Sequence, residues 1–254
     1  MTSEARTRGK STKERLDALL VERGLFESRN QAAASVMAGS VIVGDGSRPA
    51  TKPGTLVAPD AELSVKQGRR YVSRGGLKLE RALEVLDVTV QGRSALDVGA
   101  STGGFTDCLL RARAERVIAL DVAYGELHWS VRRDPRVTVI ERFNARELEP
   151  SKLPYRPDLV VVDVSFIGLS KILPAIVAAA AERFDLLALI KPQFELGRDR
   201  VGKGGVVRDP GDRADALVSV GERARSLGLA VLGYCSSGLP GPAGNRESFV
   251  WCAR

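Results

Sequence analysis

The 254-residue sequence predicts an α/β fold, in which a doubly wound, Rossmann-like parallel sheet follows a small amino-terminal α+β domain. Three observations predict it. Near-continuous apolar runs alternate with helical stretches from about residue 94 onward, as in parallel sheets that are covered on both faces. A turn rich in Gly, Ser and Thr follows the first of these runs. The elements before residue 68 are short, and a basic patch at residues 68–72 separates them from the alternating region.

The amino-terminal part is predicted to contain two helices and two short strands. A helix over 14–22 is ended by Gly24, and a second helix begins at the capping residue Ser28 and stops at Gly39. Strands are expected at 41–43 and 62–65. The divisions that we expect are a disordered basic tail (1–13), a small domain (14–68), a linker (69–73) and a larger domain (74–254).

The turn after the first long apolar run predicts a site for a nucleotide-like cofactor. A dinucleotide loop needs a third-position glycine where this chain has Ser101, and a triphosphate loop needs a lysine where it has Phe105. The remaining features are the Asp97 carboxylate and the glycines Gly99, Gly103 and Gly104. Glycines let the backbone approach a ligand closely, and this ligand has no phosphate group. An ammonium group can meet that carboxylate. The loop, with Ser101 and Phe105 in it, therefore favours S-adenosylmethionine as the cofactor.

Two later strands end in polar residues that can complete this site. The run 116–120 is followed by Asp121, about 20 residues beyond the loop, where a carboxylate binds a ribose diol. The run 137–140 leads to Asn144, which we expect to bond the adenine or its ribose.

The remaining runs place three more polar residues at one edge of the sheet. The run 158–162 ends in Asp163, and after a helix at 169–182 the run 185–190 ends in Lys191. A helix at 211–227 and two strands at 229–234 and 248–252 complete the chain, with Glu247 at the mouth of a closing hairpin. Ligands of such sheets bind at the carboxyl ends of the strands, so these side chains are expected beside the glycine-rich loop.

Lys78 joins these three residues in a quartet that can deprotonate a ribose hydroxyl and align it with a methyl donor. Alignment supplies much of the acceleration of such a displacement, and a base adds about 10²–10⁴-fold. Neutral Lys191 can be that base, a state that burial and Lys78 favour and that Asp163 and Glu247 oppose. Charged Lys191 can instead stabilise the developing alkoxide. The sequence leaves both roles open.

Five segments give nearly the whole chain a family resemblance. They are Ser-Arg-Gly-Gly-Leu-Lys-Leu at 73–79, Leu-Asp-Val-Gly-Ala-Ser-Thr-Gly-Gly-Phe-Thr at 96–106, Asp-Val-Ser-Phe at 163–166, Lys-Pro-Gln-Phe-Glu at 191–195 and Gly-Pro-Ala-Gly-Asn-Arg-Glu at 241–247. With them the chain resembles the TlyA group of RNA 2′-O-ribose methyltransferases, also labelled haemolysin A, and its catalytic half is similar to the FtsJ/RrmJ-like family.

That resemblance implies an S-adenosylmethionine-dependent rRNA (cytidine-2′-O)-methyltransferase with a Rossmann-like methyltransferase sheet. The family's Lys-Asp-Lys-Glu tetrad falls on Lys78, Asp163, Lys191 and Glu247, and Asp163 is also assigned to the cofactor. Ribosomal RNA or ribosomal subunits are the implied partners.

The small domain is similar to the RNA-binding domain of the ribosomal-protein S-four type. Residues 1–75 hold 13 Lys and Arg against 8 Asp and Glu, a net charge of +5 out of +7 for the whole chain. Such asymmetry is expected where a protein binds a phosphate backbone. The predicted phosphate contacts are Arg15, Arg23, Arg29, Arg69, Arg70 and Arg74.

Other features argue against competing functions. A lone His128 and three cysteines without Cys-x-x-Cys spacing predict no metal site and a reducing, cytoplasmic location. The longest apolar stretch, 169–190, is broken by five charged or proline residues, so no membrane insertion is expected. A membrane-acting haemolysin and a non-catalytic RNA-binding protein are therefore the weaker alternatives. Phe166 and Phe194 can stack on a flipped base, but aromatic residues beside sheet ends are more often part of the core, so we do not include them among the catalytic residues.

Overall fold

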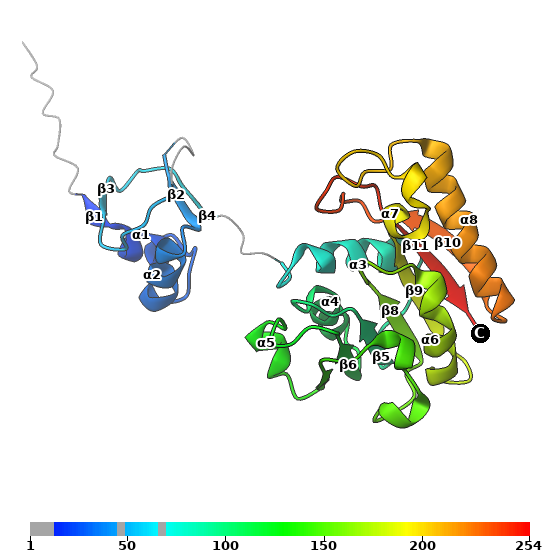
Figure 1. Cartoon of the computed structure of the whole chain (residues 1–254). Coiled ribbons are helices and arrows are strands. Elements are labelled where there is room, and N and C mark those ends of the chain that lie inside the picture. Colours follow the sequence, from blue (N-terminus) through cyan, green and yellow to red (C-terminus); the bar gives the residue numbers. More distant parts are fainter. Residues whose placement is uncertain (1–12, 45–48, 66–69) are drawn as a thin grey trace, which may run out of the picture. The chain divides into compact units, whose positions relative to one another are not determined.

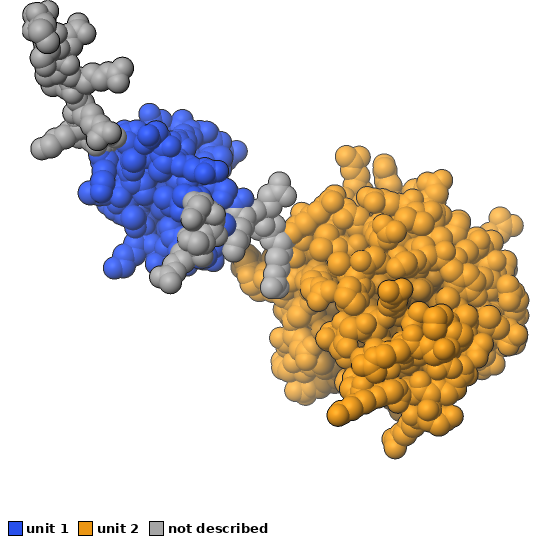
Figure 2. Space-filling view, turned by 90° about the horizontal axis from the view of Figure 1, so that it is seen from above, with its two compact units in different colours: residues 1–69 blue, residues 70–254 orange. Residues whose placement is uncertain are grey.

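The computed structural model describes residues 13–44, 49–65 and 70–254, and the chain divides into two compact units, residues 1–69 and 70–254 (Figures 1 and 2). Each unit has a hydrophobic core of its own. The tail predicted over 1–13 lies outside the described residues except for Lys13.

The first unit is a small α+β region built on two packed helices. Its elements are β1 (Glu14–Arg15), α1 (Leu16–Glu22), α2 (Arg29–Met37), β2 (Val41–Val43), β3 (Leu56–Val57) and β4 (Leu63–Val65). Strand β1 pairs antiparallel with β3, and β2 with β4. The Ser28 hydroxyl accepts the Gln31 amide at 3.3 Å, as the capping pattern predicts. The first helix begins at Leu16 rather than at residue 14, because Glu14 and Arg15 pair with β3, a strand that the sequence did not reveal.

The second unit contains a seven-stranded sheet with the order β10-β11-β9-β8-β5-β6-β7 (Figure 1). Its strands are β5 (Ser94–Val98), β6 (Arg116–Leu120), β7 (Val137–Ile140), β8 (Leu159–Val162), β9 (Asp185–Ile190), β10 (Ala230–Ser236) and β11 (Ser248–Ala253). Strands β5 to β9 are parallel, while β11 runs antiparallel to both β9 and β10. The doubly wound sheet and its closing hairpin are thus confirmed.

Helices cover both faces of this sheet. They are α3 (Arg74–Val85), α4 (Gly104–Arg111), α5 (Trp129–Arg132), α6 (Leu173–Ala179), α7 (Pro192–Glu195) and α8 (Pro210–Ser226), with short 3-10 turns η1 (Ala145–Glu147), η2 (Pro150–Lys152), η3 (Leu169–Lys171) and η4 (Arg198–Arg200). Alternate residues of each strand face opposite layers. Leu96 and Val160 pack with α6 and α8, whereas Ala95 and Val161 pack with α3 and α4.

The segment expected as a linker over 69–73 belongs to the second unit from residue 70 onward. Tyr71 is buried against Gly76, where an added Cβ would lie 2.3 Å from the tyrosine ring. The Tyr71 hydroxyl donates to Glu80 at 2.9 Å, and the Val72 amide donates to Asp107 at 2.9 Å. These contacts hold the segment at the start of α3, a helix that the sequence analysis did not assign.

The helix predicted over 169–182 is two shorter elements, η3 and α6. Pro174 sits in the first turn of α6, where proline favours a helix start, and Ala180 is already extended. In the part of the chain that the structure describes, no helix is both long and apolar enough to cross a bilayer.

Candidate active site

The site lies at the edge of the sheet where the parallel strands end. Strand order reverses between β5 and β8, and such a switch point opens a crevice beyond the carboxyl ends of the strands. Gly99 follows β5, Asp163 follows β8 and Lys191 follows β9. Glu247 directly precedes β11, whose antiparallel direction brings its start to the same edge.

The four residues predicted to act together form two ion pairs at this edge. Lys78, on α3, donates from Nζ to Glu247 Oε2 at 2.6 Å, and both side chains are buried. Lys191 Nζ lies 2.6 Å from Asp163 Oδ1 and donates to the Ser165 hydroxyl at 2.9 Å. The structure therefore brings the predicted quartet together as two pairs.

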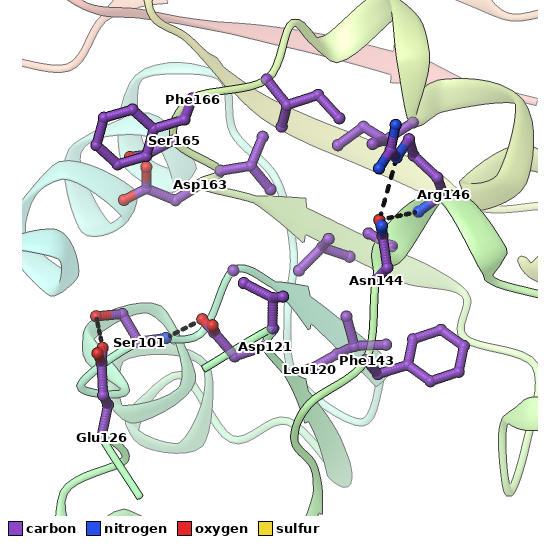
Figure 3. A pocket seen from close by; sticks show the side chains of 17 residues that line it. Ser101, Leu120, Asp121, Glu126, Phe143, Asn144, Arg146, Asp163, Ser165 and Phe166 are labelled. Atoms are coloured by element: carbon purple, nitrogen blue, oxygen red, sulfur yellow. Dashed lines mark hydrogen bonds between the residues drawn. The ribbon is translucent and has the colours of Figure 1, made fainter. Parts of the chain in front are cut away.

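Two cavities meet beside the second pair. The smaller, which we call the acceptor cavity, has a volume of about 190 Å³ and is lined by Lys78, Lys191 and Phe105 among others. The larger, which we call the cofactor cavity, has a volume of about 390 Å³ and is lined by Asp121, Asn144 and Phe143 among others (Figure 3). Both cavities share Gly99, Ser101, Asp163 and Ser165. A ligand in one is therefore in reach of a ligand in the other.

The backbone of the glycine-rich loop has a conformation that requires glycine at position 99. Gly99 has φ of +87°, and an added Cβ would lie 2.5 Å from the Asp163 carbonyl oxygen. Ser101 also has positive φ, and its amide donates to Asp121 Oδ2 at 2.7 Å. Asp121 accepts the Ala123 amide as well, at 2.8 Å. Asp121 thus lines the cofactor cavity and also fixes the loop (Figure 3).

Other predicted cofactor residues divide between the cavities and the core. Asn144 lines the cofactor cavity, and Gly104 and Phe105 line the acceptor cavity. Gly103 lines neither; it begins α4 with φ of +90°, and an added Cβ would lie 2.8 Å from Leu127.

Asp97 also lines neither cavity, because it points from β5 toward α4. It is fully buried, and its Oδ2 accepts the Thr106 hydroxyl at 2.7 Å. The pKa of this carboxyl is raised to about 7, chiefly by burial and to a smaller extent by the negative charge of Asp163, against the lowering effect of the Thr106 hydrogen bond. The direct contact with an ammonium group that the sequence suggested is therefore not preformed.

The predicted phosphate contacts are mostly engaged within the protein. Arg15 pairs with Asp17 at 2.8 Å, and Arg29 approaches the same carboxylate at 3.4 Å. Arg23 donates to the carbonyls of Ala61 and Pro59. In the second unit, Arg70 pairs with Glu80 at 2.6 Å and Arg74 donates to the Pro240 carbonyl at 3.1 Å. Arg69 lies outside the described residues.

Sequence reasoning missed three residues at the cavities. Ser165 bonds Lys191, and Glu126 accepts the Ser101 hydroxyl at 3.2 Å at the cavity wall. Phe166 has φ of +65° and is 91% exposed, so its expected place in the core is wrong. The signal was available for two of them, since Ser165 and Phe166 lie two and three residues after Asp163, the residue that directly follows β8.

Comparison with known proteins gives a consistent result. The profile of the FtsJ-like methyltransferase family matches residues 71–254. The 16S/23S rRNA (cytidine-2′-O)-methyltransferase TlyA of Mycobacterium tuberculosis is 52% identical over 239 residues, which are 93% of this chain and 88% of that protein. Hemolysin A of Brachyspira hyodysenteriae is 38% identical over 92% of this chain and 97% of its own.

The solved structures agree. A candidate hemolysin from Streptococcus thermophilus has a TM-score of 0.72 and 41% identity, covering 96% of this chain and 89% of that one. The chain therefore belongs to the TlyA family of rRNA cytidine-2′-O-methyltransferases, and residues 71–254 are its FtsJ-like methyltransferase region.

Proposed function

We propose that this protein transfers the methyl group of S-adenosylmethionine to the ribose 2′-hydroxyl of a cytidine in ribosomal RNA. The observation that carries the proposal is the junction of the two cavities at Asp163 and Ser165, with the Lys191 ammonium 2.6 Å from the Asp163 carboxylate. The name of the M. tuberculosis relative supplies the nucleotide and the kind of RNA.

The cofactor cavity suits an adenosine with a positively charged tail. Its volume falls within the range of about 300–1,000 Å³ that ligand pockets have. Apolar side chains of Leu120, Phe143 and Ile172 can cover a purine, and Asp121 and Asn144 offer acceptors to hydroxyl and amino groups. When bound, S-adenosylmethionine supplies an electrophilic methyl group. Asp163 and the glycine-rich loop residues, Gly99 and Ser101, would then hold its methionine end where the cavities meet.

The residues of the acceptor cavity align and polarise a hydroxyl group. As the bond from oxygen to methyl forms and the bond from sulfur to methyl breaks, the hydroxyl proton passes either to a neutral Lys191 amine or to the Asp163 carboxylate. In the second case a Lys191 ammonium, held by Asp163 and Ser165, stabilises the negative charge that develops on the ribose oxygen. Asp163 is the nearest carboxylate to that ammonium and can orient it. Lys78 lines the same cavity, and its hydrogen bond to the buried Glu247 carboxylate fixes its position. We propose that the four act together and that alignment supplies most of the acceleration.

RNA recognition is proposed for the first unit. Its two helices and paired short strands are compatible with the ribosomal-protein S-four type. Residues 1–69 hold 11 Lys and Arg against 8 Asp and Glu, and this net charge of +3 favours a phosphate backbone. Arg29 and Arg15 share a single carboxylate, so their guanidinium groups keep donors for phosphate. We place the enzyme in the cytoplasm, with ribosomal subunits as its partners, since ribosomal RNA is the substrate that the relatives' names give.

The proposal is tested by methyl transfer to purified ribosomal subunits. Wild-type protein should transfer radiolabel from S-adenosylmethionine, and nucleoside analysis should recover it as 2′-O-methylcytidine. Lys191→Ala should lose about 10²–10⁴-fold in rate. Lys171→Ala, which removes an exposed lysine on η3, should keep the wild-type rate. If the wild-type protein bound RNA but transferred no label to it, the result would favour a non-catalytic RNA-binding protein.

A further inference from the structure

The segment that follows β6 exposes three large hydrophobic side chains, and the first of them, Val122, lines the cofactor cavity. Val122 is 72% exposed, Tyr124 68% and Trp129 66%. Surface hydrophobic residues are common singly, but three within eight residues, two of them aromatic, are typical of an interaction site. We call this surface, Val122 with Tyr124 and Trp129, the aromatic rim.

The backbone that carries the aromatic rim is firmly held. Asp121 accepts the Ala123 amide at 2.8 Å, and Glu141 accepts the Gly125 amide at 2.9 Å. Leu127 is buried in the core beneath it. Because these contacts fix the loop from both sides, the exposed rings are presented by an ordered scaffold.

Arginines surround the rim. The Arg142 guanidinium lies 4.2 Å from the centre of the Tyr124 ring. Arg133 and Arg146 are exposed, and in the described part of the chain no carboxylate lies within 4.0 Å of any of these three guanidinium groups. The neighbouring Glu141 is already paired with Arg132. Arg142 therefore lies over the Tyr124 ring, and Arg133 and Arg146 keep donors for a phosphate, while the exposed Glu126 carboxylate lies in the same segment.

The aromatic rim is continuous with the proposed chemistry. Val122 and Glu126 line the cofactor cavity, and Glu126 contacts Ser101, which lines both cavities. Glu126, which lies between Tyr124 and Trp129 in the sequence, thus connects the aromatic rim to a residue that the two cavities share.

We infer that the aromatic rim binds unpaired nucleotides of the substrate RNA that flank the acceptor ribose, with bases stacked on Tyr124 and Trp129 and phosphates near Arg133 and Arg146. Exposed aromatic rings beside arginines match unstacked nucleotides, because the base offers a flat face for stacking and the backbone offers a phosphate. The inference rests on the proposed function and adds to it that the catalytic unit has an RNA-binding surface of its own.

The first test compares Tyr124→Ala and Trp129→Ala with the wild type in methyl transfer to purified ribosomal subunits. Each variant should raise KM for the subunits by roughly 5- to 100-fold, the cost of losing one stacked base. kcat at saturating subunits should stay within about 2-fold, because the reacting groups are untouched. Affinity for S-adenosylmethionine, measured by calorimetry, should be unchanged. Trp129→Phe should recover most of the loss.

Leu232→Ala is the matched control, because Leu232 is also an exposed hydrophobic residue, at 49% exposure. It lies on β10, one edge strand of the sheet, whereas the aromatic rim lies between β6 and β7, and β7 is the other edge strand. It should leave KM at the wild-type value. Wild-type transfer with unchanged KM in both aromatic variants would overturn the inference and leave the proposed function standing. Absence of transfer by the wild type would be a failure of the proposed function instead.

A second test needs no activity. The chain has two tryptophans, Trp129 and Trp251, so in Trp251→Phe protein the fluorescence reports the aromatic rim alone. Titration with an oligocytidylate should quench it, and Arg133→Ala should weaken the quenching. Unchanged fluorescence at saturating oligocytidylate would contradict stacking. A wild-type dimer in sedimentation that Trp129→Ala dissolves would assign the surface to a second copy of the chain.

Discussion

Two lysine–carboxylate pairs stand at the same edge of the sheet, and they differ in what they can reach. In the pair of Lys78 with Glu247 the side chains are 9% and 1% exposed, and in the pair of Lys191 with Asp163 they are 11% and 22% exposed. Both pairs have an N–O distance of 2.6 Å. The first joins α3 to the start of β11, residues 169 positions apart, and Lys78 lines the acceptor cavity. In the second, Lys191 lines the acceptor cavity and Asp163 lines both cavities.

The difference in exposure indicates different roles for the two ion pairs. Removing two charges from water costs several kcal/mol per ion, and their attraction offsets this only in good geometry. We interpret the enclosed pair as one that fixes the acceptor cavity's wall. The more open pair keeps part of its hydration and leaves Asp163 able to meet a ligand, so it is the pair that we expect to contact the reacting groups, while the enclosed pair supports it.

The largest effect that distinguishes the pairs is expected on stability. Lys78→Met would leave Glu247 buried without its cation, and the free energy of unfolding should fall by about 3–5 kcal/mol. Lys191→Met should cost less, because water can reach Asp163. Urea unfolding of both variants measures the contrast.

The double variant Lys78→Met with Glu247→Leu is the control for this prediction. It removes both charges and should recover most of the lost stability. Equal losses in the two single variants would show that enclosure does not separate the pairs.

The sequence predicted the sheet well because its signal is local. Apolar runs of strand length, each followed by a polar residue, set the strands and placed Asp163 and Lys191 at one edge. The ion-pair partners were not predictable, because they depend on strand order and on α3. Lys78 does not follow an apolar run, so no local pattern placed it at this edge, and its place in the quartet was supported by the family's tetrad.

The sequence failed where the direction of a side chain decides its role. Asp97 lies within β5, and the two-residue period of a strand turns it toward Thr106 on α4 rather than into a cavity. Phe166 looked like a core residue and is exposed. Charge counting also could not show that Arg23 is held by carbonyl oxygens of its own unit.

Asp97 extends the comparison to a buried carboxylate with no lysine beside it. Burial raises its pKa to about 7, so the native state keeps a proton that the unfolded chain loses near pH 4. The stability gained from this proton is complete below about pH 4 and is lost as the pH rises through about 7. Asp97→Asn removes the effect, so between those limits the difference in unfolding free energy between wild type and variant should change by up to about 4 kcal/mol.

The measurement is urea unfolding at a series of pH values, with Asp87→Asn as the matched control. Asp87 is exposed, and its φ of 55° is a conformation that asparagine tolerates. The unfolding free energy of Asp87→Asn should have the same dependence on pH as that of the wild type. An Asp97→Asn curve that also runs parallel to the wild type would mean that Asp97 stays charged in its buried position.

The smallest expected effect concerns how the open pair is held. Ser165→Ala removes the hydroxyl that accepts from Lys191 at 2.9 Å and leaves the Asp163 contact at 2.6 Å. A hydrogen bond to a charged group is worth about 1.5–3 kcal/mol, a factor of roughly 10 to 150. Because this bond is exposed to solvent, we expect the lower end, a fall in kcat of about 10-fold, with little change in KM or stability. Ser170→Ala, whose hydroxyl lies outside both cavities, should have wild-type kcat. An unchanged kcat in Ser165→Ala would mean that Asp163 alone positions the lysine, and a loss as large as that of Lys191→Ala would mean that the carboxylate cannot hold the ammonium without Ser165.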